Sequence, residues 1–322
     1  MPRDIDLPLG DTTLERGCVL MGDAVKARIY GPEGAPIIVV MGGISATRFV
    51  ADAEQPSERN QGRGWWSRLV HAGGPIDTNT FQVIGLDFAP NDGDGACPET
   101  ITTRDQANRL KALLDHLKID QVAAIIGSSY GGMCGLAFAQ AFPDHVAKLC
   151  VIGAAHRPYP IGVAWRGIQR RIVRLGLEAG TPKEGLKLAR ELAMTTYRTA
   201  EEFSDRFTLE ETSHNPAMFD ICDYLGSRGD RFAEQMDAKR FIALSESIDL
   251  HRVEPEAITA PTLLMTAISD QLAPLPDMRE LRDRLKGPSE LFTFTSLYGH
   301  DAFLKEYDAM GPRLAEFCES LS

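Results

Sequence analysis

Short apolar runs alternate with helical patterns along the first half of the chain, and this alternation limits the possible folds more than any other feature. Runs of strand character occupy residues 35–43, 81–88, 122–129 and 146–155. Between the second and third runs, residues 103–119 carry apolar side chains at helical spacing. Continuous apolar strands separated by helices are typical of a parallel sheet that is covered on both faces. We therefore predict an α/β fold with a mostly parallel central sheet.

This alternation stops after the fourth run. From residue 156 to residue 253 the sequence reads as successive helices rich in arginine and glutamate, and strand character returns at 260–270 and 290–296 before a closing helix. Because strands resume after the helical block, we interpret the block as an insertion rather than as an independent C-terminal domain. The predicted organisation is a core of residues 1–155 and 254–322 with a helical lid at 156–253.

The composition of the 322-residue chain excludes several classes of function. Its net charge of −11 argues against nucleic acid and anionic membranes as partners, but not against a small anionic substrate. No apolar run reaches the roughly 18 residues of a membrane-spanning helix, and the first residues lack the apolar region of a signal peptide, so we expect a cytoplasmic protein. The six cysteines form no C-x-x-C pair and H-E-x-x-H does not occur, so no metal site is predicted. Cys134 and Cys150 are interpreted as small apolar fillers.

A serine motif lies where the third apolar run meets the helix that follows it. Residues 127–131 read GSSYG, which fits G-x-S-x-G, and the next residues have helical character. A sharp strand-to-helix turn at such a motif projects the middle hydroxyl above the sheet. This register predicts Ser129 as a nucleophile, and it predicts that Ser128 packs or makes a local hydrogen bond.

A serine hydroxyl becomes a good nucleophile only with a base that is held by an acid. With this motif the acid and then the histidine follow the serine in the chain. Asp270 ends the late apolar run 260–270, and His300 follows the last run, whereas the other six histidines lack a position after a strand. We therefore predict that Ser129, Asp270 and His300 form a catalytic triad.

The charge that develops during acyl transfer needs two backbone N–H donors, which form an oxyanion hole. The N–H group of Tyr130, directly after the nucleophile, is predicted to be one donor. The second donor should come from the loop after an early strand, where the sequence reads MGGIS at residues 41–45. Gly42 is the predicted donor there, since glycine permits a close approach of backbone to substrate.

Taken with their surroundings, these residues resemble the homoserine O-acyltransferase (MetX-type) family of the α/β-hydrolase fold. Four segments in the family's order carry the resemblance: GWWSRLVHAGGPIDTNTFQVIGLDF, ITTRDQANRLKALLDHLKI, GLKLARELAMTTYRTAEEFSDRF and GHDAFL. The resemblance extends from about Ile37 to the C-terminus. It implies an α/β-hydrolase core that contains an inserted all-helical lid.

The resemblance implies a two-step transfer of an acyl group. Ser129 would take the acyl group from acyl-CoA and pass it to the hydroxyl of homoserine, with His300 as base and then acid. Asp270 would hold the imidazole and stabilise its charged form. Coenzyme A would then be a substrate, so no resident cofactor is expected. The implied context is methionine biosynthesis.

The resemblance also implies residues that bind the amino acid. Arg190 would hold its carboxylate, since a guanidinium binds a carboxylate through two parallel hydrogen bonds. Tyr197 would line the tunnel to the active site, and Asp301 would bind the ammonium group. Family members commonly dimerise through lid helices, so a homodimer is expected. The apolar positions 168, 172 and 175 suit either a dimer interface or the core of the lid.

The acyl donor and the acceptor leave alternatives. Members of the family that use succinyl-CoA tend to carry an arginine two residues after the triad aspartate, and here that position is Leu272. An apolar side chain suits an acetyl group better, because a second carboxylate is costly to bury without a cation. We therefore predict homoserine O-acetyltransferase activity, with succinyl transfer or serine as the acceptor as alternatives. A carboxylester hydrolase with the same triad and a non-enzymatic binding protein of this fold are the further alternatives.

Overall fold

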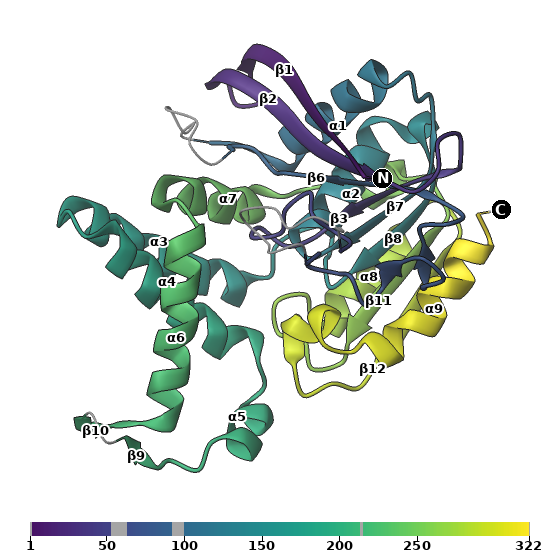
Figure 1. Ribbon diagram of the computed structural model, residues 1–322. Coiled ribbons are helices and arrows are strands. Elements are labelled where there is room, and N and C mark those ends of the chain that lie inside the picture. Colours follow the sequence, from purple (N-terminus) through teal and green to yellow (C-terminus); the bar gives the residue numbers. More distant parts are fainter. Residues whose placement is uncertain (1, 53–62, 92–99, 213–214, 322) are drawn as a thin grey trace.

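The computed structural model describes residues 2–52, 63–91, 100–212 and 215–321, and its centre is an eight-stranded sheet (Figure 1). The strands lie in the order β1-β2-β6-β3-β7-β8-β11-β12. In chain order the sheet contains β1 (Arg3–Thr13), β2 (Val19–Tyr30), β3 (Ile37–Met41), β6 (Gln82–Leu86), β7 (Val122–Ser128), β8 (Val146–Ile152), β11 (Thr262–Ala267) and β12 (Ser289–Phe294). Two short strands, β4 (Val70–His71) and β5 (Ile76–Asp77), form a separate pair.

The sheet is parallel from β6 through β12, as the continuous apolar runs predict. Only β1 and β2 run antiparallel, as a hairpin in which β2 pairs with β6, the first strand of the parallel part. The predicted α/β fold with a mostly parallel sheet is thus confirmed. The hairpin itself was not predicted from the sequence.

Helices cover both faces of the sheet, and each strand divides its side chains between them. In β3, Val39 and Met41 enter a core with α1, α2 and α8, while Ile38 and Val40 enter the core under α9. Side chains alternate in this way because successive Cβ atoms of a strand point to opposite faces. The covering helices are α1 (Thr103–His116), α2 (Tyr130–Ala141), α8 (Leu275–Arg284) and α9 (Tyr307–Glu319), and the short 3₁₀ turns of the core are η1 (Pro143–His145), η2 (Pro255–Ala257) and η3 (Gly299–Leu304).

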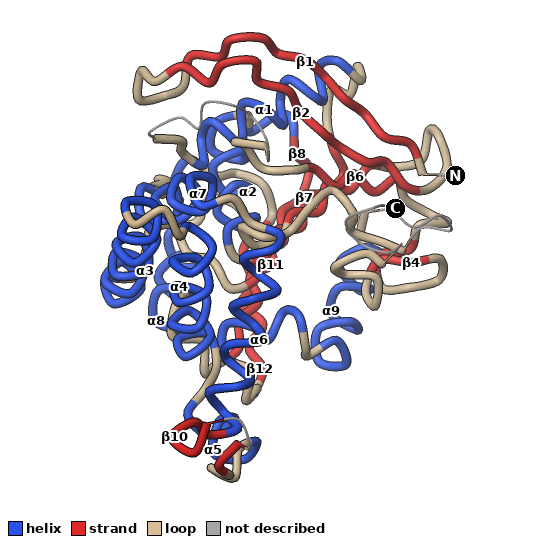
Figure 2. Tube along the Cα trace, turned by 60° about the vertical axis from the view of Figure 1, so that its left-hand side comes forward, coloured by secondary structure: helices blue, strands red, loops and turns tan. Residues whose placement is uncertain are grey.

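Five helices and a small hairpin separate β8 from β11 and project to one side of the sheet (Figure 1). They are α3 (Pro160–Glu178), α4 (Pro182–Tyr197), α5 (Ala200–Arg206), β9 (Glu211–Thr212), β10 (Asn215–Phe219), α6 (Asp220–Gln235) and α7 (Ala238–Leu250). Helix α4 packs between α3 and α6 (Figure 2) over a small core of its own. The β9–β10 hairpin was not expected. The exact boundaries of the lid, residues 156 and 253, stay a prediction.

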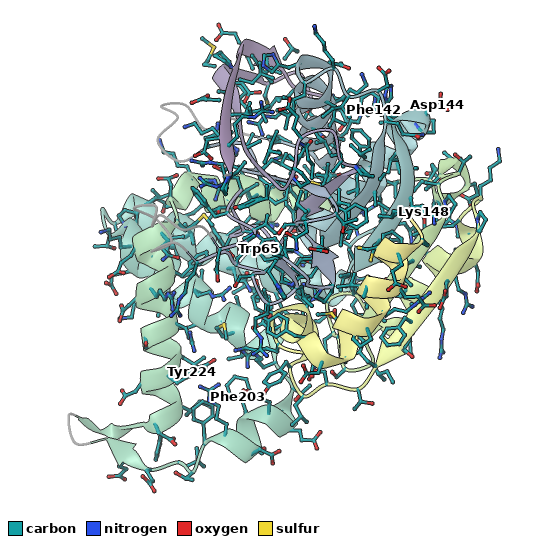
Figure 3. The ribbon with its side chains drawn as sticks, turned by 45° about the vertical axis from the view of Figure 1, so that its right-hand side comes forward. Trp65, Phe142, Asp144, Lys148, Phe203 and Tyr224 are labelled. Carbon is teal, nitrogen blue, oxygen red and sulfur yellow. The ribbon has the colours of Figure 1, made fainter. Side chains whose placement is uncertain are left out.

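The two ends of this helical segment meet at the edge of the core. The backbone N–H of Val253 donates to the carbonyl of His156 at 3.1 Å. At the far end, Phe203 of α5 and Tyr224 of α6 lie near each other (Figure 3), and the ring of Phe207 contacts both, with centroids 5.7 and 5.2 Å away. The guanidinium of Arg206 lies 4.1 Å from the centroid of the Tyr224 ring. These contacts attach α5 to α6.

Candidate active site

Ser129 occupies the turn between the end of β7 and the start of α2, in a conformation that side-chain-bearing residues rarely adopt. Its φ is 52° and its ψ is −120°. A positive φ at a residue other than glycine costs free energy and persists only where the surroundings fix it. Two hydrogen bonds fix it here: the N–H of Ser129 donates to the Ile152 carbonyl, and that of Gly131 donates to the Gly42 carbonyl, both at 2.8 Å. The turn therefore has the strained geometry that the sequence motif predicts.

The two glycines of the motif are needed because backbone atoms lie where a side chain would be. A Cβ atom at Gly127 would lie 2.3 Å from the Gly131 carbonyl oxygen, and one at Gly131 would lie 2.3 Å from that of Met41. Both distances are far inside van der Waals contact. Glycine at these positions lets the start of α2 lie directly against the ends of β3 and β7, which sets the position of Ser129.

The three predicted triad residues form one chain of hydrogen bonds. The Ser129 hydroxyl lies 2.8 Å from Nε2 of His300, and Nδ1 of His300 lies 2.8 Å from Oδ2 of Asp270. The other carboxylate oxygen of Asp270 accepts the backbone N–H groups of Leu272 and Ala273, at 2.8 and 3.0 Å. With Asp270 fixed in this way, Nδ1 of His300 carries the proton and Nε2 is free to accept the one from Ser129.

The surroundings of His300 set its affinity for a proton. Burial disfavours the charged imidazolium and is the largest single effect, but the charge and hydrogen bond of Asp270, with help from Asp301, outweigh it, so the pKa of His300 is raised. Arg166 opposes this increase. The raised pKa makes His300 a stronger base for accepting the Ser129 proton.

Ser128 and Ser129 have separate environments. The side chain of Ser128 is fully buried, and its hydroxyl has no hydrogen-bonding partner in the described part of the chain. Ser129 is partly exposed and lines a cavity. Ser128 therefore packs, without the local hydrogen bond that the sequence left open, and only Ser129 meets the histidine.

The two predicted oxyanion donors have different positions. Tyr130 is the first residue of α2, where a helix leaves its N–H groups without an internal partner. Its side chain points into the core, where the hydroxyl lies 2.7 Å from that of Ser247. In the loop after β3 the cavity is lined by Gly43, not by Gly42, whose carbonyl is held by Gly131. The assignment of Gly42 as the second donor stays a prediction, and Gly43, one residue later, is the residue of this loop that lines the cavity.

A cavity of about 100 Å³ lies beside Ser129, and both the core and the lid form its walls. The residues that the sequence nominated for substrate binding all line it together with Ser129 and His300: Arg190, Tyr197, Leu272 and Asp301. They come from α4, from the loop after β11 and from η3. The fold thus brings together residues that are more than 170 positions apart in the chain.

Arg190 and Tyr197 lie one above the other on α4. The guanidinium carbon of Arg190 is 5.3 Å from the ring centroid of Tyr197 and 5.3 Å from that of Phe232, which are distances typical of cation–π contacts. The ring of Tyr197 lies 5.9 Å from that of His300. Burial raises the pKa of Tyr197, while the charge of Arg190 opposes the increase. No carboxylate pairs with Arg190 among the described residues, so its charge is available to a ligand.

Asp301 has a partner that sequence reasoning missed. Its Oδ2 atom accepts a hydrogen bond from Nε of Arg198 at 3.0 Å, and Arg198 also donates to Glu202 at 3.0 Å. Asp301 and Arg198 are both buried. One side of the Asp301 carboxylate is thereby held, and Asp301 lines the cavity. The position of Arg198, directly after Tyr197 in the sequence TTYRT, was the only available signal.

Helix α3 also contributes a wall that the sequence did not single out. Gly162, Trp165, Arg166 and Gln169 line the cavity. Their spacing of three, four and seven residues places them on one face of the helix. The spacing could have been noticed, but which face of α3 turns toward the core is set by packing against α4 and α7.

Within the described residues, no group of three or more histidine, cysteine, aspartate or glutamate side chains could hold a metal ion. Five cysteines are free, namely Cys18, Cys134, Cys150, Cys222 and Cys318, and Cys97 lies outside the described residues. Burial raises the pKa of the Cys134 and Cys150 thiols, which agrees with their role as apolar fillers. None of the described helices is long and apolar enough to cross a membrane.

Comparison with known proteins shows to which fold family this chain belongs. A family model for the alpha/beta hydrolase fold matches residues 62–307. Among solved structures, esterase E22 superimposes with a TM-score of 0.87 at 22% identity, covering 100% of both chains, which supports the same fold. The chain is thus an α/β-hydrolase-fold protein.

Two relatives narrow the class. The homoserine O-succinyltransferase of Xanthomonas campestris pv. campestris is 39% identical over 285 residues, covering 88% of this chain and 76% of the relative. The homoserine O-acetyltransferase of Carboxydothermus hydrogenoformans is 27% identical, covering 96% and 93%. The chain belongs to the homoserine O-acyltransferase family, as the sequence resemblance indicates.

Proposed function

We propose that this protein transfers an acyl group from acyl-CoA to the hydroxyl of homoserine through an acyl-enzyme on Ser129. One observation carries the proposal. The hydrogen-bonded chain from Ser129 through His300 to Asp270 opens into the same cavity as Arg190 and Asp301. A guanidinium without a carboxylate partner among the described residues lies in one cavity with a carboxylate, and the two match the charges of a free amino acid.

In the first step His300 accepts the Ser129 proton while the oxygen attacks the thioester carbonyl. The tetrahedral intermediate collapses, the carbon–sulfur bond breaks, and coenzyme A leaves as a thiol with the proton from His300. In the second step His300 takes the proton of the homoserine hydroxyl, whose oxygen attacks the acyl-enzyme. Ser129 is released with that proton, so the enzyme returns unchanged. The backbone N–H groups of Tyr130 and Gly43 would stabilise both oxyanions.

In this proposal Arg190 holds the homoserine carboxylate and Asp301 holds its ammonium group. The ion pair with Arg198 would fix the direction of the Asp301 carboxylate, and Tyr197 would form the wall between Arg190 and the triad. Coenzyme A is a substrate here, and no resident cofactor takes part in either step.

The proposal is tested by following the release of free thiol from acetyl-CoA and succinyl-CoA with and without homoserine, with product masses as the second readout. We expect release that depends on homoserine, with the O-acyl amino acid as product. Serine in place of homoserine tests the alternative acceptor. Ser129→Ala should abolish the activity and Ser128→Ala should retain it, because only Ser129 meets the histidine. Unchanged activity in Ser129→Ala would refute the acyl-enzyme on Ser129, and a wild type without any activity would favour a binding protein of this fold.

Ester hydrolysis is the second candidate, and the likeness to esterase E22 favours it, since the same triad hydrolyses esters when water reaches the acyl-enzyme. The charged residues Arg190 and Asp301 favour transfer instead, because neither is needed to hydrolyse a simple ester. A rate of thiol release that does not change when homoserine is added would support hydrolysis.

The observations disagree on whether the acyl donor is acetyl-CoA or succinyl-CoA. Leu272 lines the cavity and supports the acetyl group that the sequence analysis favours. The relative with 39% identity is named for succinyl transfer, and a second arginine lines the cavity.

A homodimer is also part of the proposal. On α3, Ile161, Ile168 and Leu175 are 44%, 48% and 64% exposed, and Leu188 on α4 is 52% exposed, whereas Ile172 packs against the lid core. Covering these apolar side chains with the same surface of a second copy of the chain would stabilise a homodimer. Light scattering on the purified protein tests this.

A further inference from the structure

The inner face of α3 brings a second cation to the cavity. Arg166 is one helical turn after Gly162 and one turn before Gln169, and all three line the same space as Ser129. Its guanidinium lies over Gly162, where an added Cβ atom would be 3.1 Å from Nη1 and 3.2 Å from Nη2. The charge of Arg166 opposes the increase in the pKa of both His300 and Tyr197.

The charges of the cavity exceed the needs of homoserine. Its described lining carries two guanidinium groups, Arg166 and Arg190, and one carboxylate, Asp301. A free amino acid offers one carboxylate and one ammonium group, so Arg190 and Asp301 can accommodate both. Arg166 is left over.

The charge of Arg166 is only partly balanced inside the protein. Its Nε donates to Asp249 at 2.6 Å, but the other oxygen of Asp249 is held by Arg170, also at 2.6 Å. Two cations thus share one carboxylate. The three side chains are only 9–12% exposed. A positive charge that is buried and shared in this way is costly unless an anion joins it.

Gln169 adds a polar group without a partner. It is 3% exposed, it lines the cavity, and its amide has no hydrogen-bonding partner among the described residues. Because the side chain lines the cavity, its amide can donate an N–H group to a ligand there. It lies one turn from Arg166, so the two can bind the same group.

We propose that Arg166 and Gln169 form a second anion site in the cavity, which binds the free carboxylate of a dicarboxylic acyl group, of which succinyl is the test case. The inference rests on the proposed function, because the group is delivered as a CoA thioester and held as an acyl-enzyme on Ser129. It makes this chain a succinyl-type transferase despite Leu272. The arginine expected beside the triad aspartate is replaced here by one on the lid.

The test compares kcat/KM for succinyl-CoA and acetyl-CoA, each with saturating homoserine, in the full-length protein and its variants. Arg166→Met removes the cation and keeps the length of the side chain. Arg170→Met is the matched control, since it pairs with the same Asp249 but does not line the cavity. Gln169→Leu tests the amide, and thermal unfolding of each variant checks that it is folded.

We expect the wild type to prefer succinyl-CoA. Arg166→Met should lower kcat/KM for succinyl-CoA about a hundredfold or more relative to kcat/KM for acetyl-CoA. Gln169→Leu should shift the donor ratio in the same direction by about tenfold. Arg170→Met should keep the wild-type ratio.

Three results would overturn the inference. The first is a wild type that prefers acetyl-CoA. The second is an Arg166→Met or Gln169→Leu variant that loses both donors equally. The third is a raised KM for homoserine with either donor in Arg166→Met, which would assign Arg166 to the acceptor. Failure of the proposed function itself is distinguishable, because thiol release would then not depend on homoserine in any variant.

Discussion

Replacing Gly131 by alanine would disturb the position of Ser129 without removing any reacting group. The new Cβ would lie 2.3 Å from the Met41 carbonyl oxygen, whereas real Cβ atoms essentially never approach closer than 3.0 Å. The start of α2 and the end of β3 must therefore separate by at least about 0.7 Å. This movement also stretches the 2.8 Å hydrogen bond from Gly131 to the Gly42 carbonyl.

The effect on catalysis should exceed the effect on stability. A misplacement of about 1 Å can cost about a hundredfold in rate, so we expect kcat to fall roughly 30-fold to 100-fold. Overpacking costs about 1–3 kcal/mol, and the better helix propensity of alanine offsets about 1 kcal/mol of it. The net loss of about 0–2 kcal/mol leaves a folded protein.

The assay is the release of thiol from acyl-CoA at saturating homoserine, with urea unfolding as the measure of stability. Gly135→Ala is the control on the same helix, since its Cβ would meet only the side-chain ends of Ile125 and Leu149, both at 3.2 Å. We expect near-normal kcat for this control. A folded Gly131→Ala variant with wild-type kcat, or an equal loss in Gly135→Ala, would refute the reasoning.

Three further predictions concern buried charged and titratable groups. Burial lowers the pKa of His251 to about 3, so between about pH 6.5 and about pH 3 the unfolded state binds up to one proton more than the folded state. The free energy of unfolding should then decrease as the pH is lowered through this range, by up to about 1.4 kcal/mol per pH unit. Urea titrations at several pH values should show a smaller pH dependence of the unfolding free energy in His251→Gln, but not in the exposed control His116→Gln. Arg198→Lys keeps the charge beside Asp301 but loses the planar guanidinium, so KM for homoserine should rise about tenfold with a smaller change in kcat. A fall in kcat as large as the rise in KM would indicate a structural role alone. His300 must be neutral to accept a proton and its pKa is raised, so kcat/KM should fall with decreasing pH, with a midpoint above about 6.5; a lower midpoint would contradict the geometry.

The sequence predicts the parallel part of the fold well, because strands buried on both faces leave continuous apolar runs. It does not reveal β1 and β2. The side chains of β1 alternate between half-buried and exposed positions, and Asp4 and Asp6 occupy exposed ones, so β1 has none of the continuous apolar character by which the parallel strands are recognised. Only the pairing of β2 with β6 makes this hairpin part of the sheet, and no local signal shows that pairing.

The residues of the site likewise divide into those that the sequence predicts and those that it does not. Ser129, Asp270 and His300 are predictable because each follows a strand in a fixed order, so their meeting is a property of the topology. Arg166 and Gln169 are not predictable in this way, since their orientation depends on how α3 packs against α4 and α7. Which glycine of the loop after β3 lines the cavity, Gly42 or Gly43, likewise depends on the conformation of that loop, which the sequence does not show.

The hydrogen bond between Val253 and His156 shows that the chain leaves and re-enters the core at nearly one point. A segment anchored in this way can be exchanged for one of another length without moving the strands on either side, as insertions with adjacent ends generally can. The nucleophile, acid and base stay on the core, while Arg166, Gln169 and Arg190 belong to the exchangeable part. Exchange of this helical segment would thus change the acyl donor or the acceptor and leave the triad on the core unchanged.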